Sequence, residues 1–173
     1  MPQTPAQNAV RRFTPRTVTV PVTRPPGQDW LNRPLVWAID PYHAPPDRFP
    51  RDCPRIAVWP TPATPPEDRR CHFPDPNRRM ILYTETAWQD RIAATALYRY
   101  AFAPAGFQPL NDAGMHVSHG AVEPVSVVKI PNLIAALARA KVDLRFVDHL
   151  GPLHSLRSSS LHVSAIRLRN AAD

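Results

Sequence analysis

The chain has 173 residues, a formal net charge of +7 and 43% hydrophobic residues. This length predicts one domain that can bury a core without disulfides, and the hydrophobic content excludes a disordered chain. Its two cysteines, Cys53 and Cys71, are too few for a disulfide framework, so we expect a cytoplasmic protein. We expect neither a signal peptide nor a membrane span, because no apolar run approaches about 20 residues.

Arginine supplies almost all of the positive charge, and proline is abundant at 23 residues while glycine is rare at 5. A guanidinium suits phosphate and carboxylate, so the arginines fit an anionic ligand. The codon bias of a GC-rich genome explains the same composition. Because the arginines are scattered and form no basic stripe, we do not expect a nucleic-acid partner.

Taken in chain order, short apolar runs alternate with proline-rich loops. Residues 1–10 predict a loose terminus, and 11–173 a single domain. The expected strands are 13–22 at a sheet edge, 35–39, 56–59, 78–83, 97–102, 115–118, 122–130 and 144–147. The expected helices are 65–71 with Thr64 as its cap, 85–95 with Thr84 as its cap, and 133–141, which Pro131 and Asn132 open. For 148–169 the apolar pattern fits helix and strand equally.

These elements predict an α+β fold with six to eight short, mixed or antiparallel strands and two or three helices, because regular alternation of strand and helix is absent. The most apolar positions of the separate elements are expected to share one core. They are Trp37, Ile39, Val58, Trp88, Leu137 and Phe146.

The connection between the runs 35–39 and 56–59 carries many reactive side chains. Arg51 and Arg55 flank Cys53, and such a pair makes a fork for a phosphate and favours a thiolate. The alternative is a surface ion pair beside a buried, inert cysteine. His43 lies in the same connection and is a further candidate for ligand binding.

A second polar group follows Gly114. Strand alternation places His116 and Ser118 on one face, where a histidine base and a hydroxyl nucleophile are able to meet. Glu123 is the acidic residue best suited to polarise a ribose hydroxyl. These three are the catalytic candidates, and an exposed polar hairpin is the alternative.

The last candidates lie near the end of the chain. Ser159 and His162, together with Arg167, are able to bind an anion through hydroxyl, ring and guanidinium donors, whereas a helix cap explains the serine equally well. No pair of cysteine or histidine residues has the spacing of a zinc site, so no metal is expected. The sequence identifies no cofactor.

Several motifs resemble an uncharacterised bacterial family, domain of unknown function 6886. They are PLVWAID at 34–40, HAP at 43–45, FPRDCPRI at 49–56, Trp88 with Asp90, LYRY at 97–100, VEPV at 122–125 and SSLHVSAIRLRN at 159–170. The likeness spans about 12–170. More loosely, that family resembles the ADP-ribosyltransferase superfold, which implies a similar α+β fold and an NAD-like ligand. Residues 1–10 lack the histidine that holds the NAD ribose in that superfold, so we expect weak or no NAD binding and no NAD hydrolysis.

Two functions from different classes therefore remain. The first is an enzyme that handles a small molecule or nucleotide in an arginine-lined, anion-binding cleft. The second is a non-catalytic binding module that retains an ADP-ribosyltransferase-like fold. The sequence alone does not decide between them.

Overall fold

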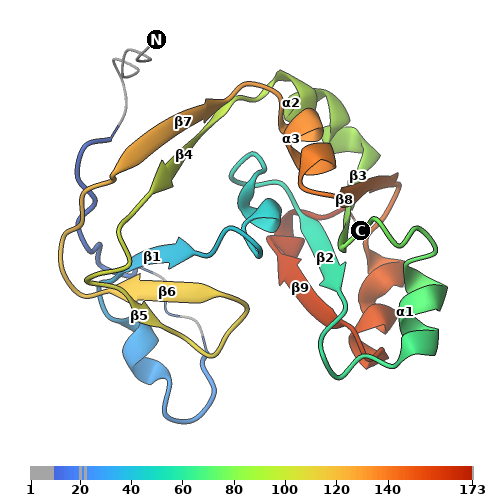
Figure 1. Cartoon of the computed structure of the whole chain (residues 1–173), viewed down its shortest axis with the longest axis horizontal. Helices are drawn as coiled ribbons and strands as arrows, with labels where there is room; N and C mark the ends of the chain where they lie inside the picture. Colours follow the sequence, from blue (N-terminus) through green and yellow to red (C-terminus); the bar gives the residue numbers. More distant parts are fainter. Residues whose placement is uncertain (1–9, 20, 22, 173) are drawn as a thin grey trace. The chain divides into compact units, whose positions relative to one another are not determined.

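The computed structural model describes residues 10–19, 21 and 23–172, which form two compact units (Figure 1). Unit 1 takes its described residues from 1–44 and 98–129, and unit 2 from 45–97 and 130–172. The α+β class predicted from the sequence is confirmed, with three α-helices and nine strands in the described part. The terminus predicted for 1–10 lies outside the described residues apart from Val10.

Unit 1 is built on a three-stranded antiparallel sheet with the order β1-β6-β5 (Figure 1). Its strands are β1 (Val36–Ile39), β5 (Gln108–Pro109) and β6 (Met115–Ser118), and the 3-10 helix η1 (Asp29–Asn32) precedes them. Leu31, Leu35 and Val117 form its buried core. The edge strand expected at 13–22 consists of two isolated bridges, at Phe13 and Arg16, in the described residues.

Strands β4 (Leu97–Ala101) and β7 (Ser126–Ile130) form a separate two-stranded ribbon. Each strand begins or ends within one residue of the boundary between the two units.

Unit 2 holds a four-stranded mixed sheet with the order β8-β3-β2-β9. The strands are β2 (Arg55–Trp59), β3 (Met80–Glu85), β8 (Val142–Val147) and β9 (His162–Ile166). The helices are α1 (Pro66–His72), α2 (Gln89–Ala94) and α3 (Leu133–Arg139), and the 3-10 helices are η2 (Pro45–Asp47), η3 (Thr86–Trp88), η4 (Gly151–Ser158) and η5 (Leu168–Asn170). Strands β3 and β8 are parallel, and the other pairs are antiparallel.

The central strands β2 and β3 are buried on both faces, which explains their continuous apolar sequences. Ile56, Val58 and Ile81 pack on one face against Leu150 and Leu161. Strand alternation turns the neighbouring residues of β2 and β3 to the opposite face. The undecided stretch 148–169 thus contains both η4, whose leucines pack against this core, and strand β9.

The expectation of one shared core is wrong. Trp37 and Ile39 belong to unit 1, whereas the other four residues belong to unit 2. Val58 and Leu137 are buried, but Trp88 and Phe146 are only partly so. Trp88 is only partly buried because it lies in a 3-10 turn after the end of β3, where its ring is against the Arg91 guanidinium.

The two helix caps expected from the sequence, Thr64 and Thr84, are also wrong, because contacts with distant parts of the chain engage both residues. The Thr64 hydroxyl donates to Ser160 O and accepts from Thr61 N, and α1 begins after Pro65 without a side-chain cap. Thr84 is a fully buried residue of β3. Asn132 does cap α3, because its Oδ1 accepts a hydrogen bond from Ala135 N at 2.9 Å. Within the described residues, no helix is long and apolar enough to cross a membrane.

The burial of one face of α3 makes a testable prediction. Leu137 is completely buried, whereas Ile134 on the same helix is 37% exposed. We expect Leu137→Ala to lower the free energy of unfolding by about 2–5 kcal/mol, because it leaves a cavity, and Ile134→Ala to lower it by less than about 1 kcal/mol. Urea denaturation followed by tryptophan fluorescence measures both values, and equal losses would contradict this packing.

Candidate functional site

A pocket of about 440 Å³ in unit 1 is the candidate binding site. Three segments line it: the loop that follows β4, the end of β6, and the loop from β6 toward β7. The lining residues are Phe102, Ala103, Ala105, Gly106, Phe107, Ser118, His119, Gly120, Ala121, Val122 and Glu123. Its volume lies within the range of small-molecule sites, and its lining combines apolar walls with a few polar groups.

Two of the three catalytic candidates meet at this pocket. Ser118 is the last residue of β6 and is 4% exposed, while Glu123 lies on the exposed loop beyond it. The Ser118 hydroxyl donates to Gly120 O and accepts from Gly120 N, each at 3.3 Å, which stabilises the turn. His116 lies two residues earlier in β6, pairs with Ala38 across the sheet, and is not part of the pocket lining.

Aromatic rings form one side of the pocket. The Phe102 and Phe107 ring centroids lie 5.6 Å apart with the planes tilted by 51°. Behind them, the Phe13 ring packs edge-on against Tyr100 and Phe102. These contacts hold the aromatic wall in place, and they depend on the bridge between Phe13 and Val122.

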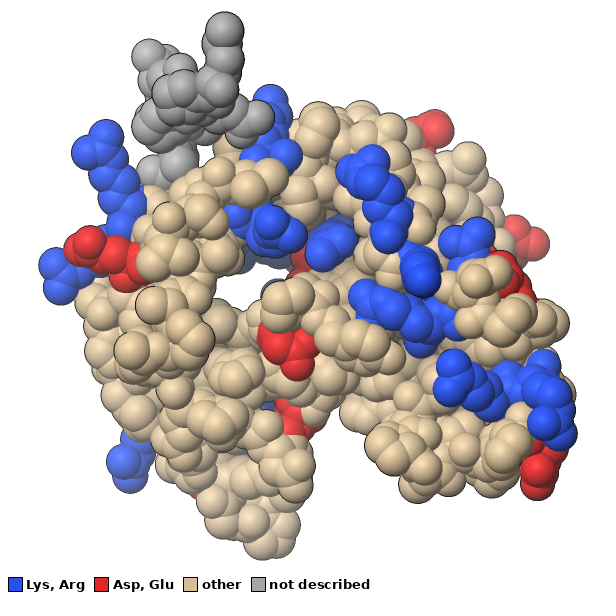
Figure 2. Space-filling model, in the orientation of Figure 1, with Lys and Arg blue, Asp and Glu red and all other residues tan. Residues whose placement is uncertain are grey.

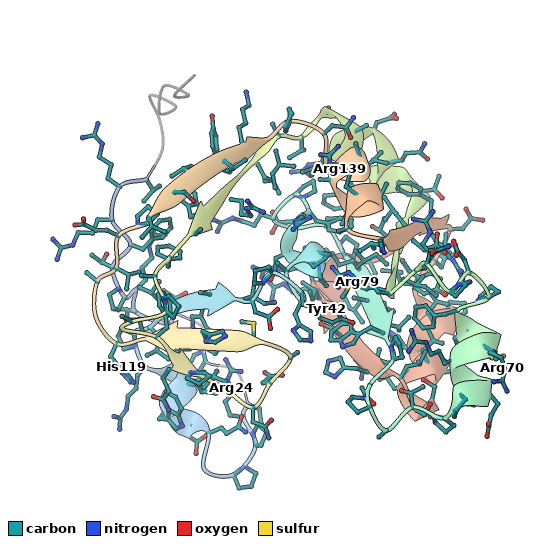
Figure 3. All side chains as sticks on the ribbon, in the orientation of Figure 1. Arg24, Tyr42, Arg70, Arg79, His119 and Arg139 are labelled. Carbon is teal, nitrogen blue, oxygen red and sulfur yellow. The ribbon has the colours of Figure 1, made fainter. Side chains whose placement is uncertain are left out.

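Two further side chains of unit 1, His119 and Arg24, are not among the predicted site residues, although the sequence places His119 in the polar group after Gly114. The His119 ring lines the pocket and stacks on Trp30 at 5.9 Å. The Arg24 guanidinium lies 5.5 Å from the centre of the Trp37 ring, and its buried Nε has no hydrogen-bond partner among the described residues. Figure 3 labels both His119 and Arg24. Each of these two side chains contacts a tryptophan that is distant in the sequence. The order of residues along the chain does not predict such a contact.

His43 lies at the other end of the β1–β6 pair, roughly 13 Å from Ser118 along the strand. Its Nδ1 is 2.8 Å from Asp40 Oδ2, and its backbone N–H donates to Asp40 Oδ1. Burial would raise the pKa of Asp40, but the hydrogen bonds from His43 outweigh it and hold that pKa below its ordinary value. Gly114, with φ of 72°, lies directly against both side chains.

Among the predicted ligand-binding residues of unit 2, Arg55 is 5% exposed. Its Nε donates to Pro46 O, its Nη1 donates to Cys53 O at 2.7 Å, and its Nη2 is 3.7 Å from Asp47 Oδ1. These contacts are within the protein, so the guanidinium serves the fold. Arg51, by contrast, is exposed on the preceding turn.

Cys53 is completely buried, as the alternative interpretation of this segment holds. Burial raises the pKa of the Cys53 thiol, and the Thr84 hydroxyl at 3.2 Å and the nearby Arg55 offset this only in part. The structure thus disfavours a thiolate at this position.

The remaining predicted residues lie at two ends of the β2–β9 pair. Arg167 is exposed beyond the end of β9 where Ile166 pairs with Arg55. His162, at the other end of β9, stacks on Trp59 with 4.2 Å between the ring centres, and Ser159 precedes it. The two ends are roughly 13 Å apart along the strand. Within unit 2, these residues therefore form two groups and not one.

The described residues contain no group of three histidine, cysteine, aspartate or glutamate side chains that is able to hold a metal ion.

Residues 5–171 match the model of a family of unknown function (DUF6886). Comparisons with curated proteins and with solved structures gave no match.

The burial of the two cysteines leads to a prediction about their reactivity. Because Cys71 is exposed and Cys53 is buried, we expect one thiol to react rapidly with an alkylating reagent near neutral pH, and the second only in denaturant. Mass spectrometry of the labelled protein gives the two rates. Cys71→Ser should remove the rapid phase, and a rapid phase that survives this substitution would contradict the burial of Cys53.

The contact between Gly114 and the Asp40–His43 pair leads to a second prediction. In Gly114→Ala the new Cβ would overlap Asp40 Oδ2 and His43 Nδ1 at a left-handed backbone position, so we expect a loss of about 1–3 kcal/mol in unfolding free energy. Nothing lies within 4 Å of a Cβ added at Gly120, so Gly120→Ala is the control. Equal urea midpoints for the two variants would show that the pair is not packed on Gly114.

Proposed function

The chain belongs to the family of unknown function DUF6886, and we propose that, in this member, the pocket of unit 1 binds a small molecule with a planar aromatic part and hydroxyl or amino donors, as a nucleoside has. The observation that carries the proposal is the presence of Ser118 and Glu123 in one pocket with an aromatic wall. The resemblance to the ADP-ribosyltransferase superfold implies a ligand of the same class.

The aromatic lining of the pocket favours a ligand with a flat ring. Phe102 and Phe107 offer ring faces and edges to an aromatic ring, while small residues such as Gly106 and Ala121 leave room for it. Stacking on such side chains tolerates any base, because each base has a π-face.

The polar groups of the pocket favour hydroxyl and amino donors. The Glu123 carboxylate accepts hydrogen bonds, and a ribose offers two neighbouring hydroxyls to such an acceptor. The same carboxylate repels a phosphate. The ligand's polar part that faces Glu123 is therefore uncharged or cationic.

Binding without catalysis is the form of the proposal that the contacts favour. In the described part of the chain, the Ser118 hydroxyl is hydrogen-bonded to Gly120 and not to a histidine, so no base is in place to activate it. An enzyme with Glu123 as its carboxylate is the second candidate, and it is favoured by the position of Glu123 at the pocket.

Calorimetry with adenosine tests the proposed ligand class. We expect a dissociation constant of about 0.1 mM, from roughly 0.3 kcal/mol per ligand atom. Glu123→Ala should weaken binding about tenfold, because it removes a charged acceptor. The control is Glu67→Ala, which changes an exposed carboxylate on α1 of unit 2.

If no nucleoside binds, or if adenosine binds Glu123→Ala as tightly as the wild type, the proposed ligand class is wrong. Chromatography after incubation with NAD separates the two forms of the proposal. We expect no released nicotinamide, and release that depends on Glu123 would favour the enzyme.

A further inference from the structure

A group of positively charged side chains in unit 2 surrounds the end of α3. Arg48 Nη1 donates to Ala136 O at 3.4 Å, and Arg79 Nε donates to Ala140 O at 2.7 Å. Two more cations come from the helix end itself. The four residues, which we call the α3 cluster, are Arg48, Arg79, Arg139 and Lys141.

The cluster lies at the surface. Figure 2 shows lysine and arginine side chains gathered over the part of unit 2 that contains α3, and Figure 3 labels Arg79 and Arg139 there. Arg139 and Lys141 are exposed, and neither takes part in an ion pair within the described residues. At Arg139 and Lys141 the positive charge of the α3 cluster is therefore exposed to solvent.

Stabilisation of the helix end does not account for four cations. The C-terminus of a helix carries the equivalent of about half a negative charge, and the effect is confined to the last turn. Two arginines already donate to carbonyls there. Further positive charges repel these two, so the group gains most when a multivalent anion neutralises it.

The backbone at Lys141 gives a second, independent observation. Lys141 has φ of 59°, and its N–H donates to Ala138 O at 3.0 Å, so it occupies the left-handed position that ends the helix. Glycine is the residue that this position favours, because a Cβ strains the left-handed backbone. The chain thus holds a cation where a glycine would be more stable.

We propose that the α3 cluster binds the oligophosphate group of a small molecule. Guanidinium groups match phosphate oxygens in a bidentate geometry, and a chain of linked phosphates carries several charges to meet several cations. A single carboxylate would neutralise only a small part of the cluster. The site is independent of the unit 1 pocket, where the Glu123 carboxylate selects against phosphate.

Calorimetry with inorganic tripolyphosphate at low salt tests the proposal on the full chain. We expect Arg139→Gln and Lys141→Gly each to weaken binding about tenfold, because each removes a charged donor. The control is Arg70→Gln, an exposed arginine on α1 of the same unit that Figure 3 shows apart from Arg139, and it should bind as the wild type does.

Lys141→Gly separates binding from folding. Because glycine relieves the left-handed strain, the melting temperature of this variant should equal or exceed that of the wild type while tripolyphosphate binding falls. A purely structural role for Lys141 predicts the reverse, namely a lower melting temperature and unchanged binding.

The source of the phosphates follows from a comparison of ATP with tripolyphosphate. Equal binding supports recognition of the phosphates alone, and tighter binding of ATP with the same losses in the variants supports a nucleotide.

The proposal is overturned if the wild type does not bind tripolyphosphate or if the variants bind it equally well. It is also overturned in favour of nucleic acid if a single-stranded oligonucleotide binds more tightly than tripolyphosphate and loses affinity in the same variants. Adenosine carries no phosphate, so this outcome is separate from that of the unit 1 test.

Discussion

The Arg55 guanidinium holds the proline-rich segment 45–54 against the sheet of unit 2. Prolines lack an N–H, so carbonyls in such a segment depend on donors from elsewhere. Arg55 supplies them, to Pro46 O and Cys53 O, and its charge lies 5.2 Å from the centre of the Phe49 ring. The ion pair with Asp47 adds little, because at 3.7 Å it joins a half-exposed carboxylate. Because this segment is held in place, Arg48 lies within hydrogen-bond distance of Ala136 O near the end of α3.

Local pattern predicted many elements of the fold, but it did not predict β5 or decide the structure of 148–169, and it did not predict which elements pack together. The runs 35–39 and 56–59 form strands as predicted, since branched and aromatic residues there suit a pleated, buried surface. Thr64 and Thr84 look alike as helix caps in the sequence, yet one bonds to Ser160 O and the other is buried in β3. The single core failed for the same reason, because each unit is assembled from segments far apart in the chain.

The candidate site was predicted in part. Ser118 and Glu123 were chosen for their chemistry, and a turn after β6 brings them to one pocket with His119. The arginines could not be ranked from sequence alone, because Arg55 and Arg139 differ in environment and not in residue type. Burial makes the first a structural donor to two carbonyls, whereas the second is exposed at a helix end. An arginine-rich composition therefore carries little functional meaning until each guanidinium has been assigned its contacts.

A left-handed backbone position points to a candidate binding site only where it coincides with clustered positive charge. Ala113, Lys141 and Arg167 all have positive φ, in a chain with five glycines. Ala113 carries no functional group, so a left-handed turn position does not by itself identify a site. Arg167 lies near the buried Arg55. Burial is the main reason that the pKa of Arg55 is lowered, and the charge of Arg167 lowers it further. This repulsion disfavours a further cation beside Arg55. At Lys141 strain coincides with two arginines already bound to the same helix end. Both the strain at Lys141 and the repulsion among the four cations destabilise the fold there. An anion that binds the α3 cluster would offset the repulsion, whereas the strain remains as the consequence of placing a fourth positive charge at this position.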